Sequence, residues 1–459
     1  MSEILVGFEG DGSGVEELTW GQRRIWSATR ISGLSINMGG AVRVPPGFTA
    51  QDVAASLRFL VGRHQALRTR LAFTDDGEPR QAVAAGGEMP LEVIDAGDGD
   101  PAQVAAAVKQ RYQATNFYRD HEWPLRNAVI VQHGAVTHSV AVYSQLAIDA
   151  YSLDALVADL ARMDPATGEA TAPPPELQPL DLARRQRESS ALRVNKAAMR
   201  HWERVLREMP ARQFGEERAE ADRSTPRYWE LGYNSPAAHL AARIVAARDQ
   251  TDSGAVLLAA FAVALAGVTG INPVMVGLLV SNRFRPGLAD IVSPLAQIGP
   301  CLIDVADGSF DDVVERAQRG MLGAGMNAYY DPRQFDALVA AVSAERGEEI
   351  ELSCVFNDRR RASRDAGDGP LPIPEQVREA LPRSAERLQA KLDRPNRKLF
   401  VHINDVRDTV DVVMRGDTHF ISPAQLSACL RGMESTIVDA ACDVSRRTSG
   451  GTPLGRFRV

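Results

Sequence analysis

The chain has 459 residues, a formal net charge of −7 at pH 7 and a sequence pI of about 5.7. This length exceeds that of one ordinary domain, roughly 100–200 residues, so the sequence predicts at least two lobes. The net negative charge and the lack of a long basic run argue against a nucleic-acid-binding protein, which normally carries a basic stripe.

Composition also limits the redox, metal and membrane classes. The cysteines are scattered and form neither a CxxC pair nor a metal-ligand spacing, so we expect reduced, buried thiols and no metal site. Residues 1–17 contain neither a basic nor an apolar signal-peptide region. The longest nearly apolar run, 255–267, is shorter than the about 20 residues of a membrane span. We therefore expect a soluble, cytoplasmic protein that does not enter a membrane.

In the first part of the chain, amphipathic patterns predict helices over 51–67 and 153–163. Between them, apolar runs predict strands over 128–132 and 137–143, joined by a turn at His133-Gly134. The following segment, 164–175, is rich in Pro, Gly and Thr, which indicates a linker. We therefore place a first lobe at 1–175.

The rest of the chain predicts a second lobe at 176–445 and a disordered tail at 446–459. Pro423 directly follows Ser422, and this order is typical of a helix start with proline at its first position. In chain order, we expect a charged helix over 181–208, a buried helix over 255–266, a buried strand over 274–280, a hairpin over 398–404 and 409–414, and a helix over 423–441.

The segment 140–152 predicts a buried strand that runs into a turn, with the letters SQLAIDAYS at 144–152. This segment resembles the signature HHxxxDGxS of one acyltransferase superfamily. Ser144 and Gln145 stand where the two histidines belong, and Ala150 replaces the glycine. Asp149 and the final serine of the signature are retained, so the frame of a catalytic motif is present without its base.

Further motifs in the right order resemble those of the condensation domains of nonribosomal peptide synthetases. The letters LTWGQRRIW at 18–26 resemble the first family motif, and RHQALRTRL at 63–71 matches RHxxLRTxF except for its last residue. The resemblance spans about 18–442. The other segments that carry it are 181–188, His201-Trp202, 256–261, Val276-Gly277, Asn282-Arg283, Ile298-Gly299-Pro300 and, weakly, Gln334-Phe335-Asp336.

The resemblance implies an α/β (α+β) fold of two chloramphenicol acetyltransferase-like lobes, arranged as a V-shaped pseudo-dimer with a central tunnel. It also implies two partners, a donor and an acceptor peptidyl or acyl carrier protein. Their phosphopantetheine arms would carry the substrates, so no cofactor is expected to be bound by this chain itself. Neither a carrier nor an adenylation module is visible in the sequence, and we therefore expect a free-standing protein that serves its partners in trans.

The missing histidine restricts the chemistry. Gln145 can donate and accept hydrogen bonds but cannot take up a proton near neutral pH, and a positioned base contributes typically about 10²–10⁴-fold. An α-amine has a pKa of about 8, so part of it is already nucleophilic at neutral pH, and alignment supplies effective molarities of about 10⁵–10⁸ M. We therefore predict amide rather than ester formation, with Gln145 orienting the amine or holding the oxyanion.

The resemblance also assigns roles to other residues. The candidate catalytic set is Gln145, Ser144 and Asp149, and within it we expect Asp149 to act structurally, by pairing with Arg283 across the lobe junction. Because alanine resists a left-handed backbone, we expect a different turn at Ala150. The remaining candidates are structural motif residues, for which scaffold roles are expected: Arg63, Arg68, Asn282 and Arg283.

Two hypotheses from different classes stay open. One is an amide-forming condensation enzyme; the other is an inactive platform that binds carrier proteins or recruits a tailoring enzyme. A heterocyclisation domain is disfavoured because Ser144 stands where its first aspartate belongs, and epimerising or acyl-CoA-dependent relatives need the missing histidine. His64 and His138 lie elsewhere in the pattern and do not replace it. The basic run 359–361 predicts a solvated loop or a carrier-docking site.

Overall fold

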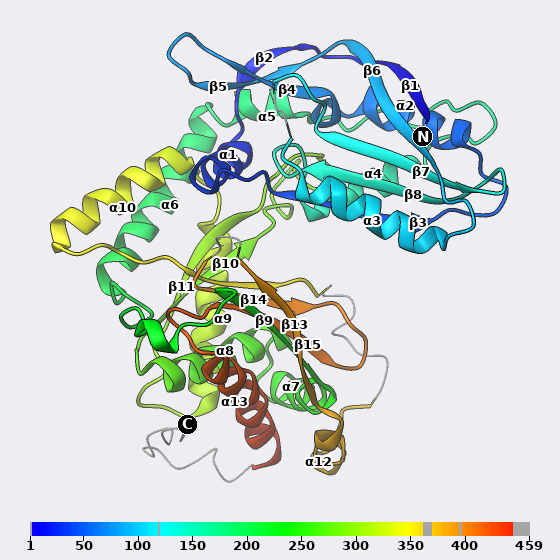
Figure 1. Cartoon of the computed structure of the whole chain (residues 1–459). Helices are drawn as coiled ribbons and strands as arrows, with labels where there is room; N and C mark the ends of the chain where they lie inside the picture. Colours follow the sequence, from blue (N-terminus) through cyan, green and yellow to red (C-terminus); the bar gives the residue numbers. More distant parts are fainter. Residues whose placement is uncertain (1, 118–119, 361–369, 394–396, 444–459) are drawn as a thin grey trace. The chain divides into compact units, whose positions relative to one another are not determined.

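The computed structural model describes residues 2–117, 120–360, 370–393 and 397–443 (Figure 1). The chain divides into two compact units: the first unit contains Met1–Arg193 and Ser281–Gln297, and the second contains Val194–Val280 and Ile298–Val459. The predicted boundary at 175 is therefore too early, and the predicted first lobe lacks 281–297. The predicted disordered tail at 446–459 lies outside the described residues.

The reason for the later boundary lies in the helix α5, Pro179–Arg185, which belongs to the first unit. The Gln81 side chain donates to the Pro179 carbonyl at 3.1 Å, and just past the helix the Gln186 side chain accepts from the Trp20 backbone N–H at 2.8 Å. Because Gln186 serves as this partner, the predicted single helix over 181–208 is in fact two helices. The second, α6, spans Ser189–Glu208.

The first unit contains a five-stranded and a three-stranded sheet. In the larger sheet β6 and β7 are parallel and the other neighbours antiparallel. Its order is β1 (Ser2–Glu9), β6 (Gly86–Asp95), β7 (Leu125–Gln132), β8 (Ala135–Ser144) and β3 (Asn37–Arg43); the smaller sheet has the order β2 (Gly14–Glu17), β5 (Pro79–Val83) and β4 (Thr69–Phe73). The predicted hairpin around His133-Gly134 is confirmed as β7 and β8. Strands β1 and β2 were not predicted.

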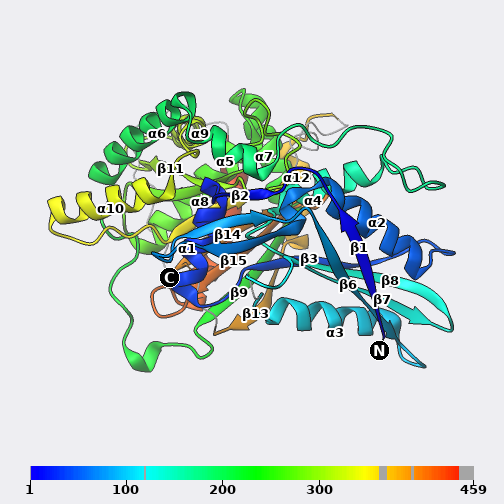
Figure 2. The same cartoon turned by 90° about the horizontal axis from the view of Figure 1, so that it is seen from above.

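Helices cover both faces of the larger sheet (Figures 1 and 2). Apolar residues of α2 (Ala50–Arg63) and α4 (Ala150–Leu160) pack with one face, and those of α3 (Pro101–Ala114) pack with the other. The predicted helix over 51–67 ends at Arg63, because His64 takes an extended backbone and a 3-10 turn, Gln65–Arg68, follows. The N-terminal helix α1 spans Trp20–Ser32.

The second unit is built on a seven-stranded sheet. Helices α7 (Pro236–Arg248), α8 (Ser253–Thr269) and α13 (Pro423–Cys442) form with it the largest buried core. The predicted helix over 255–266, strand over 274–280, C-terminal hairpin and last helix are all confirmed, and Ser422 caps α13 ahead of its first-position proline. The strand order is β11 (Gln297–Ile303), β10 (Val274–Val280), β12 (Cys354–Asp358), β14 (Leu399–Asn404), β15 (Val410–Asp417), β9 (Tyr228–Ser235) and β13 (Ala385–Leu392).

The second unit also contains α9 (Phe310–Met326), α10 (Pro332–Arg346) and α12 (Pro374–Ala380), and the short 3-10 turns Glu220–Asp222 and Leu381–Arg383. All four cysteines are free thiols, as the sequence predicted. Three of them are buried, but Cys442 is only half-buried, so the prediction of burial is wrong for this residue. In the described part of the chain, no single helix is long and apolar enough to cross a membrane. Helices α7 and α8 meet these two criteria only when they are taken together, and the pair is bent by 112°.

Candidate functional site in the first unit

The signature segment lies where β8 ends and α4 begins. Backbone hydrogen bonds fix its turn: the Ser144 N–H donates to the Pro124 carbonyl at 2.9 Å, and the Gln145 N–H donates to the Ile36 carbonyl at 2.8 Å. Asp149 has an extended backbone and caps α4, whose first residue is Ala150. Ala150 is therefore helical rather than left-handed, and the expected difference from the turn of family members with glycine stays a prediction.

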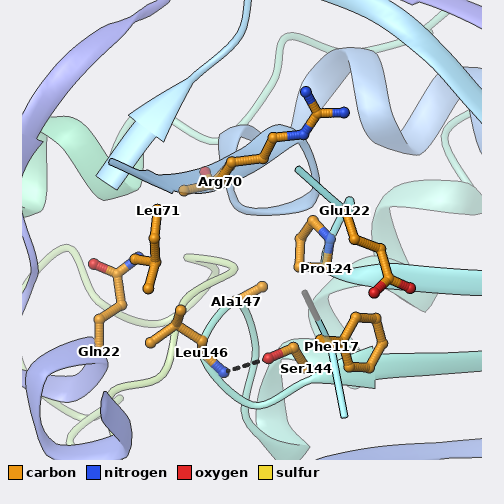
Figure 3. A pocket seen from close by; sticks show the side chains of 10 residues that line it. Gln22, Arg70, Leu71, Phe117, Glu122, Pro124, Ser144, Leu146 and Ala147 are labelled. Atoms are coloured by element: carbon orange, nitrogen blue, oxygen red, sulfur yellow. Dashed lines mark hydrogen bonds between the residues drawn. The ribbon is translucent and has the colours of Figure 1, made fainter. Parts of the chain in front are cut away.

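Ser144 is buried and turned into its own turn, where its hydroxyl oxygen accepts from the Leu146 backbone N–H at 3.3 Å (Figure 3). It contributes to a small, mainly apolar pocket of about 350 Å³, a figure that includes open solvent at the mouth. The pocket is lined by Gln22, Thr69, Arg70, Leu71, Phe117, Glu122, Pro124, Ser144, Leu146 and Ala147. Its walls are mainly apolar.

The charged residues of this pocket do not offer a free acid or base. The Arg70 guanidinium turns away from Ser144 and lies 3.6 Å from the centre of the Trp123 ring (Figure 3). Burial lowers the pKa of Arg70. Glu122 is paired with Arg126, whose Nε lies 2.6 Å from its carboxylate. Both charged side chains that line this pocket are therefore engaged with other residues of the first unit.

Gln145 is half-buried, and among the described residues its side-chain amide has no hydrogen-bond partner. It is also absent from the residues that line the pocket. An unpaired primary amide can both donate and accept, but it cannot act as a base. The Gln145 amide is therefore available to orient a polar group and unable to deprotonate it.

Asp149 is fully engaged in structural hydrogen bonds. Its carboxylate accepts from the Ser152 backbone N–H and hydroxyl, both at 3.0 Å. It also accepts from the Arg283 guanidinium at 2.8 Å and from the backbone N–H groups of Leu295 and Ala296 at 2.9 and 3.4 Å. A carboxylate with this many donors joins the start of α4 to the segment 281–297. The predicted pair with Arg283 is present, but both residues belong to the first unit rather than to different lobes.

The segment 281–297 is held by further contacts within the first unit. Asn282 is buried with a left-handed backbone, φ 60°, and donates to the Leu295 carbonyl at 3.0 Å. Gly21, in the first turn of α1, lies so close to the Pro294 carbonyl that a Cβ would clash with it, and the Arg24 Nε donates to the Ala296 carbonyl at 3.0 Å. The segment is thereby fixed against both α1 and α4.

Arg63 and Arg68 lie in other parts of the scaffold. Arg63, at the end of α2, makes a two-pronged ion pair with Asp159 of α4, at 2.7 and 2.8 Å, and His64 Nε2 lies 3.0 Å from the same carboxylate. Burial alone would raise the pKa of Asp159, but the hydrogen bonds from Arg63 and His64 hold it far below its ordinary value. The buried Arg68 donates to the backbone carbonyls of Asp11 and Ala84.

The structure thus brings together only part of the predicted set. Asp149, Asn282 and Arg283 form one network, Ser144 and Gln145 lie at the preceding turn, and Arg63 and Arg68 stand apart. Sequence reasoning missed Asp159 as the partner of Arg63, although an acid on the neighbouring amphipathic helix was the available signal. It also missed the backbone donors of 293–296, for which a residue pattern gives no signal.

Residues 13–357 of the chain match the family model of the condensation domain. The chain belongs to the condensation domain family. The isonitrile lipopeptide synthase of Mycobacterium tuberculosis is 26% identical over 378 residues, which are 78% of this chain and 15% of that protein. The phosphinothricin tripeptide synthetase PhsC of Streptomyces viridochromogenes is 26% identical over 386 residues, which are 80% of this chain and 35% of that protein. This condensation domain therefore spans only a fraction of the length of either relative.

Solved structures confirm the mixed α/β fold. The X-domain from teicoplanin biosynthesis superposes with a TM-score of 0.72 at 17% identity and covers 98% of this chain and 99% of its own. The first condensation domain of the calcium-dependent antibiotic synthetase, in complex with a substrate analogue, gives a TM-score of 0.67 at 16% identity, with 94% and 97% coverage. At these identities the likeness shows the fold alone, and the chemistry must be argued from this chain's own residues.

Proposed function

We propose that this condensation domain forms an amide bond between two carrier-bound substrates in nonribosomal peptide, or hybrid peptide-polyketide, biosynthesis. Gln145 stands in place of the catalytic histidine. The observation that carries the proposal is the unpaired amide of Gln145 at the end of β8, where the family signature places its second histidine. Ser144 and Asp149 support this position by fixing the turn rather than by transferring protons.

The chemistry follows from what the amide can do. The free amine of an acceptor, with a pKa of about 8, needs orientation but not deprotonation before it attacks a thioester. The Gln145 carbonyl can accept an N–H of that amine, while its NH₂ group can donate to the oxygen that becomes negative in the tetrahedral intermediate. An alcohol would need a base, and the side chains of Ser144, Gln145 and Asp149 offer none that is free.

The partners in this proposal are a donor and an acceptor carrier protein, each presenting its substrate on a phosphopantetheine arm, so the domain itself would bind no cofactor. Free-standing action in trans, a cytoplasmic location and a tunnel for the two arms all belong to the proposal as well. Support comes from the family membership and from matched proteins such as PhsC, which is named as a tripeptide synthetase.

The test is an intact-mass assay with a carrier protein loaded with an acyl donor and a second carrier loaded with an aminoacyl acceptor. We expect the wild type to form condensed product, Gln145→Ala to lose most of it, and Gln145→His to retain it. Gln110→Ala, on the exposed side of α3, is the matched control and should not change the yield. Equal yields from wild type and Gln145→Ala would show that the Gln145 amide takes no part.

A second candidate function is that of an inactive docking platform. The full engagement of Asp149 and the absence of a base at the Ser144-Gln145 turn favour it, and one structural relative is an X-domain solved in complex with the protein OxyB from teicoplanin biosynthesis. The same assay separates the two candidates. No product from wild type, together with binding of a carrier protein and product from Gln145→His, would identify the platform.

A further inference from the structure

The sheet of the second unit has one apolar and one polar face. Along β14, Leu399, Val401 and Ile403 are buried in the core, so Phe400, His402 and Asn404 point to the opposite side. The pairing register extends this side across the four strands β12, β14, β15 and β9. We call it the polar sheet face and define it by Asn357, Arg359, His402, Asn404, Asp411, Arg415 and Glu230.

The acids of the polar sheet face are each paired with an arginine. Glu230 on β9 accepts from the Arg415 Nε on β15 at 2.8 Å. Asp411, buried on β15, accepts from Arg387 at 3.0 Å and from the Asn404 amide at 2.8 Å. The negative charges of Glu230 and Asp411 are therefore balanced by the positive charges of Arg415 and Arg387. Any excess charge on this face must therefore come from another residue.

Arg359, just past the end of β12, supplies that excess charge. Its Nη2 donates to His402 Nε2 at 3.0 Å and its Nη1 donates to the Asn404 side-chain oxygen at 3.3 Å, and both of these acceptors are uncharged. Within the described ranges of the chain it makes no ion pair with a carboxylate. A guanidinium has five N–H donors, so three remain on this exposed residue. The predicted basic run 359–361 extends to residue 361, which lies outside the described residues, and its carrier-docking or solvated role stays a prediction.

His402 accepts a hydrogen bond from Arg359 and lies within the electrostatic reach of Arg359 and Arg415. Because a guanidinium can only donate, the Nε2 of His402 accepts in this contact and the ring is neutral, while the Asn357 side-chain amide lies 3.3 Å from Nδ1. Burial, together with the charges of Arg359 and Arg415, lowers the pKa of His402 to about 3.

We propose that the polar sheet face binds the carboxylate of a small organic acid, with Arg359 as its anchor. The planar guanidinium matches a carboxylate in a two-pronged geometry. The Phe400 ring, whose centre lies 4.3 Å from that of His402, gives the attached carbon skeleton a flat apolar surface. One uncompensated arginine suits a single negative charge better than a phosphate monoester, which carries about −1.5 to −2 at pH 7. This site is independent of the chemistry proposed for Gln145.

The test measures binding of benzoate to the full chain by NMR line broadening, with benzamide as the uncharged isostere and inorganic phosphate as the competing anion. Phenylglyoxal labelling with peptide mass spectrometry then reports whether bound benzoate protects Arg359. Variants Arg359→Gln and Arg359→Lys test the anchor. Arg378→Gln is the matched control, because Arg378 forms an exposed ion pair with Glu375 on α12 of the same unit.

We expect benzoate to bind and to protect Arg359, and Arg359→Gln to weaken binding at least about tenfold, as loss of a charge-assisted hydrogen bond does. Arg359→Lys should bind benzoate with intermediate strength, because lysine keeps the positive charge but cannot form two parallel hydrogen bonds to a carboxylate. Arg378→Gln should leave binding unchanged. Equal binding of benzamide, unchanged binding in Arg359→Gln, or no benzoate binding at all would overturn the site. Binding of phosphate in place of benzoate would overturn its assignment to a carboxylate.

Discussion

The carboxylate of Asp149 lies 2.8 Å from the guanidinium of Arg283, although the two residues are 134 positions apart in the sequence. Both belong to the first unit, because the segment 281–297 leaves the second unit and packs on α1 and α4. The aspartate of the family signature therefore holds a distant segment in place. Its carboxylate joins the start of α4 to this segment through the hydrogen bonds to Ser152, Leu295 and Ala296.

Asp149→Ala should lower the free energy of unfolding by about 3–5 kcal/mol, because it leaves the charge of Arg283 buried without its partner. Denaturant unfolding at pH 7 measures this loss. Asp181→Ala is the matched control: Asp181 pairs with Arg184 on the surface, and removing an exposed pair costs about 0–1 kcal/mol. A similar small loss in both variants would contradict the anchoring role of Asp149.

Asp159→Asn should also destabilise the chain, by about 3 kcal/mol at pH 7, since Arg63 and His64 lose a buried anion. The pKa of Asp159 is lowered in the folded chain, so its contribution to stability is present above the unfolded pKa of about 3.9 and is lost as the pH falls. The difference between wild type and variant should therefore narrow below about pH 4. Denaturant unfolding of both proteins between pH 3 and pH 7 measures this difference in the free energy of unfolding. A difference that does not change with pH would contradict the lowered pKa of Asp159.

The strongly periodic elements were predictable from sequence. The strand 274–280 and the helix that starts at Pro423 follow from an apolar run and from a capped proline, both of which are local signals. The strands β1 and β2 were missed because Gly-rich, acidic residues 1–17 give a weak local pattern, and pairing with β6 and β5 decides their structure. The break before α6 was missed because Gln186 is fixed by Trp20, a residue 166 positions away.

The candidate site was predictable only in part, for the same reason. The motif letters located Ser144, Gln145 and Asp149, and the resemblance supplied Arg283 as a partner. Nothing in the letters distinguishes an engaged Asp149 from a free one, because two of its donors are backbone N–H groups at 295 and 296. The polar sheet face was not predicted, since its residues come from strands whose register only the folded sheet defines.

His402→Gln should flatten the pH dependence of stability. The pKa of His402 is lowered from 6.5 to about 3 by burial and by Arg359 and Arg415. Between these two pH values His402 is protonated in the unfolded chain but not in the folded chain. The free energy of unfolding therefore falls as the pH drops from about 6.5 toward 3. Removing the imidazole removes this penalty, which is on the order of a few kcal/mol.

Chemical denaturation at pH 4.5 and pH 7.5 measures this effect, and an NMR titration of the ring follows the proton directly. The variant should lose less stability than wild type between the two pH values. His419→Gln is a control, because this histidine faces Glu217 at 3.0 Å rather than two arginines. An imidazole of His402 that titrates near 6.5 in the folded chain would contradict the lowering of its pKa by burial and by the two arginines.

The pH dependence of condensation tests the role of Gln145 most directly. If no side chain of the domain acts as a base, the single-turnover rate should follow the free-amine fraction of the acceptor. It should then rise about tenfold per pH unit and level off near the amine pKa of about 8. In Gln145→His the imidazole adds a second inflection near pH 6.5.

Replacing the acceptor amine with a hydroxyl separates orientation from deprotonation. Wild type should then form no ester at any pH at which the protein is folded, whereas Gln145→His should gain ester formation as its imidazole loses its proton. Gln110→Ala should behave as wild type with both acceptors. Ester formation by wild type with an inflection between pH 5 and 7 would reveal a base other than Gln145, and the amide chemistry proposed here would have to be revised.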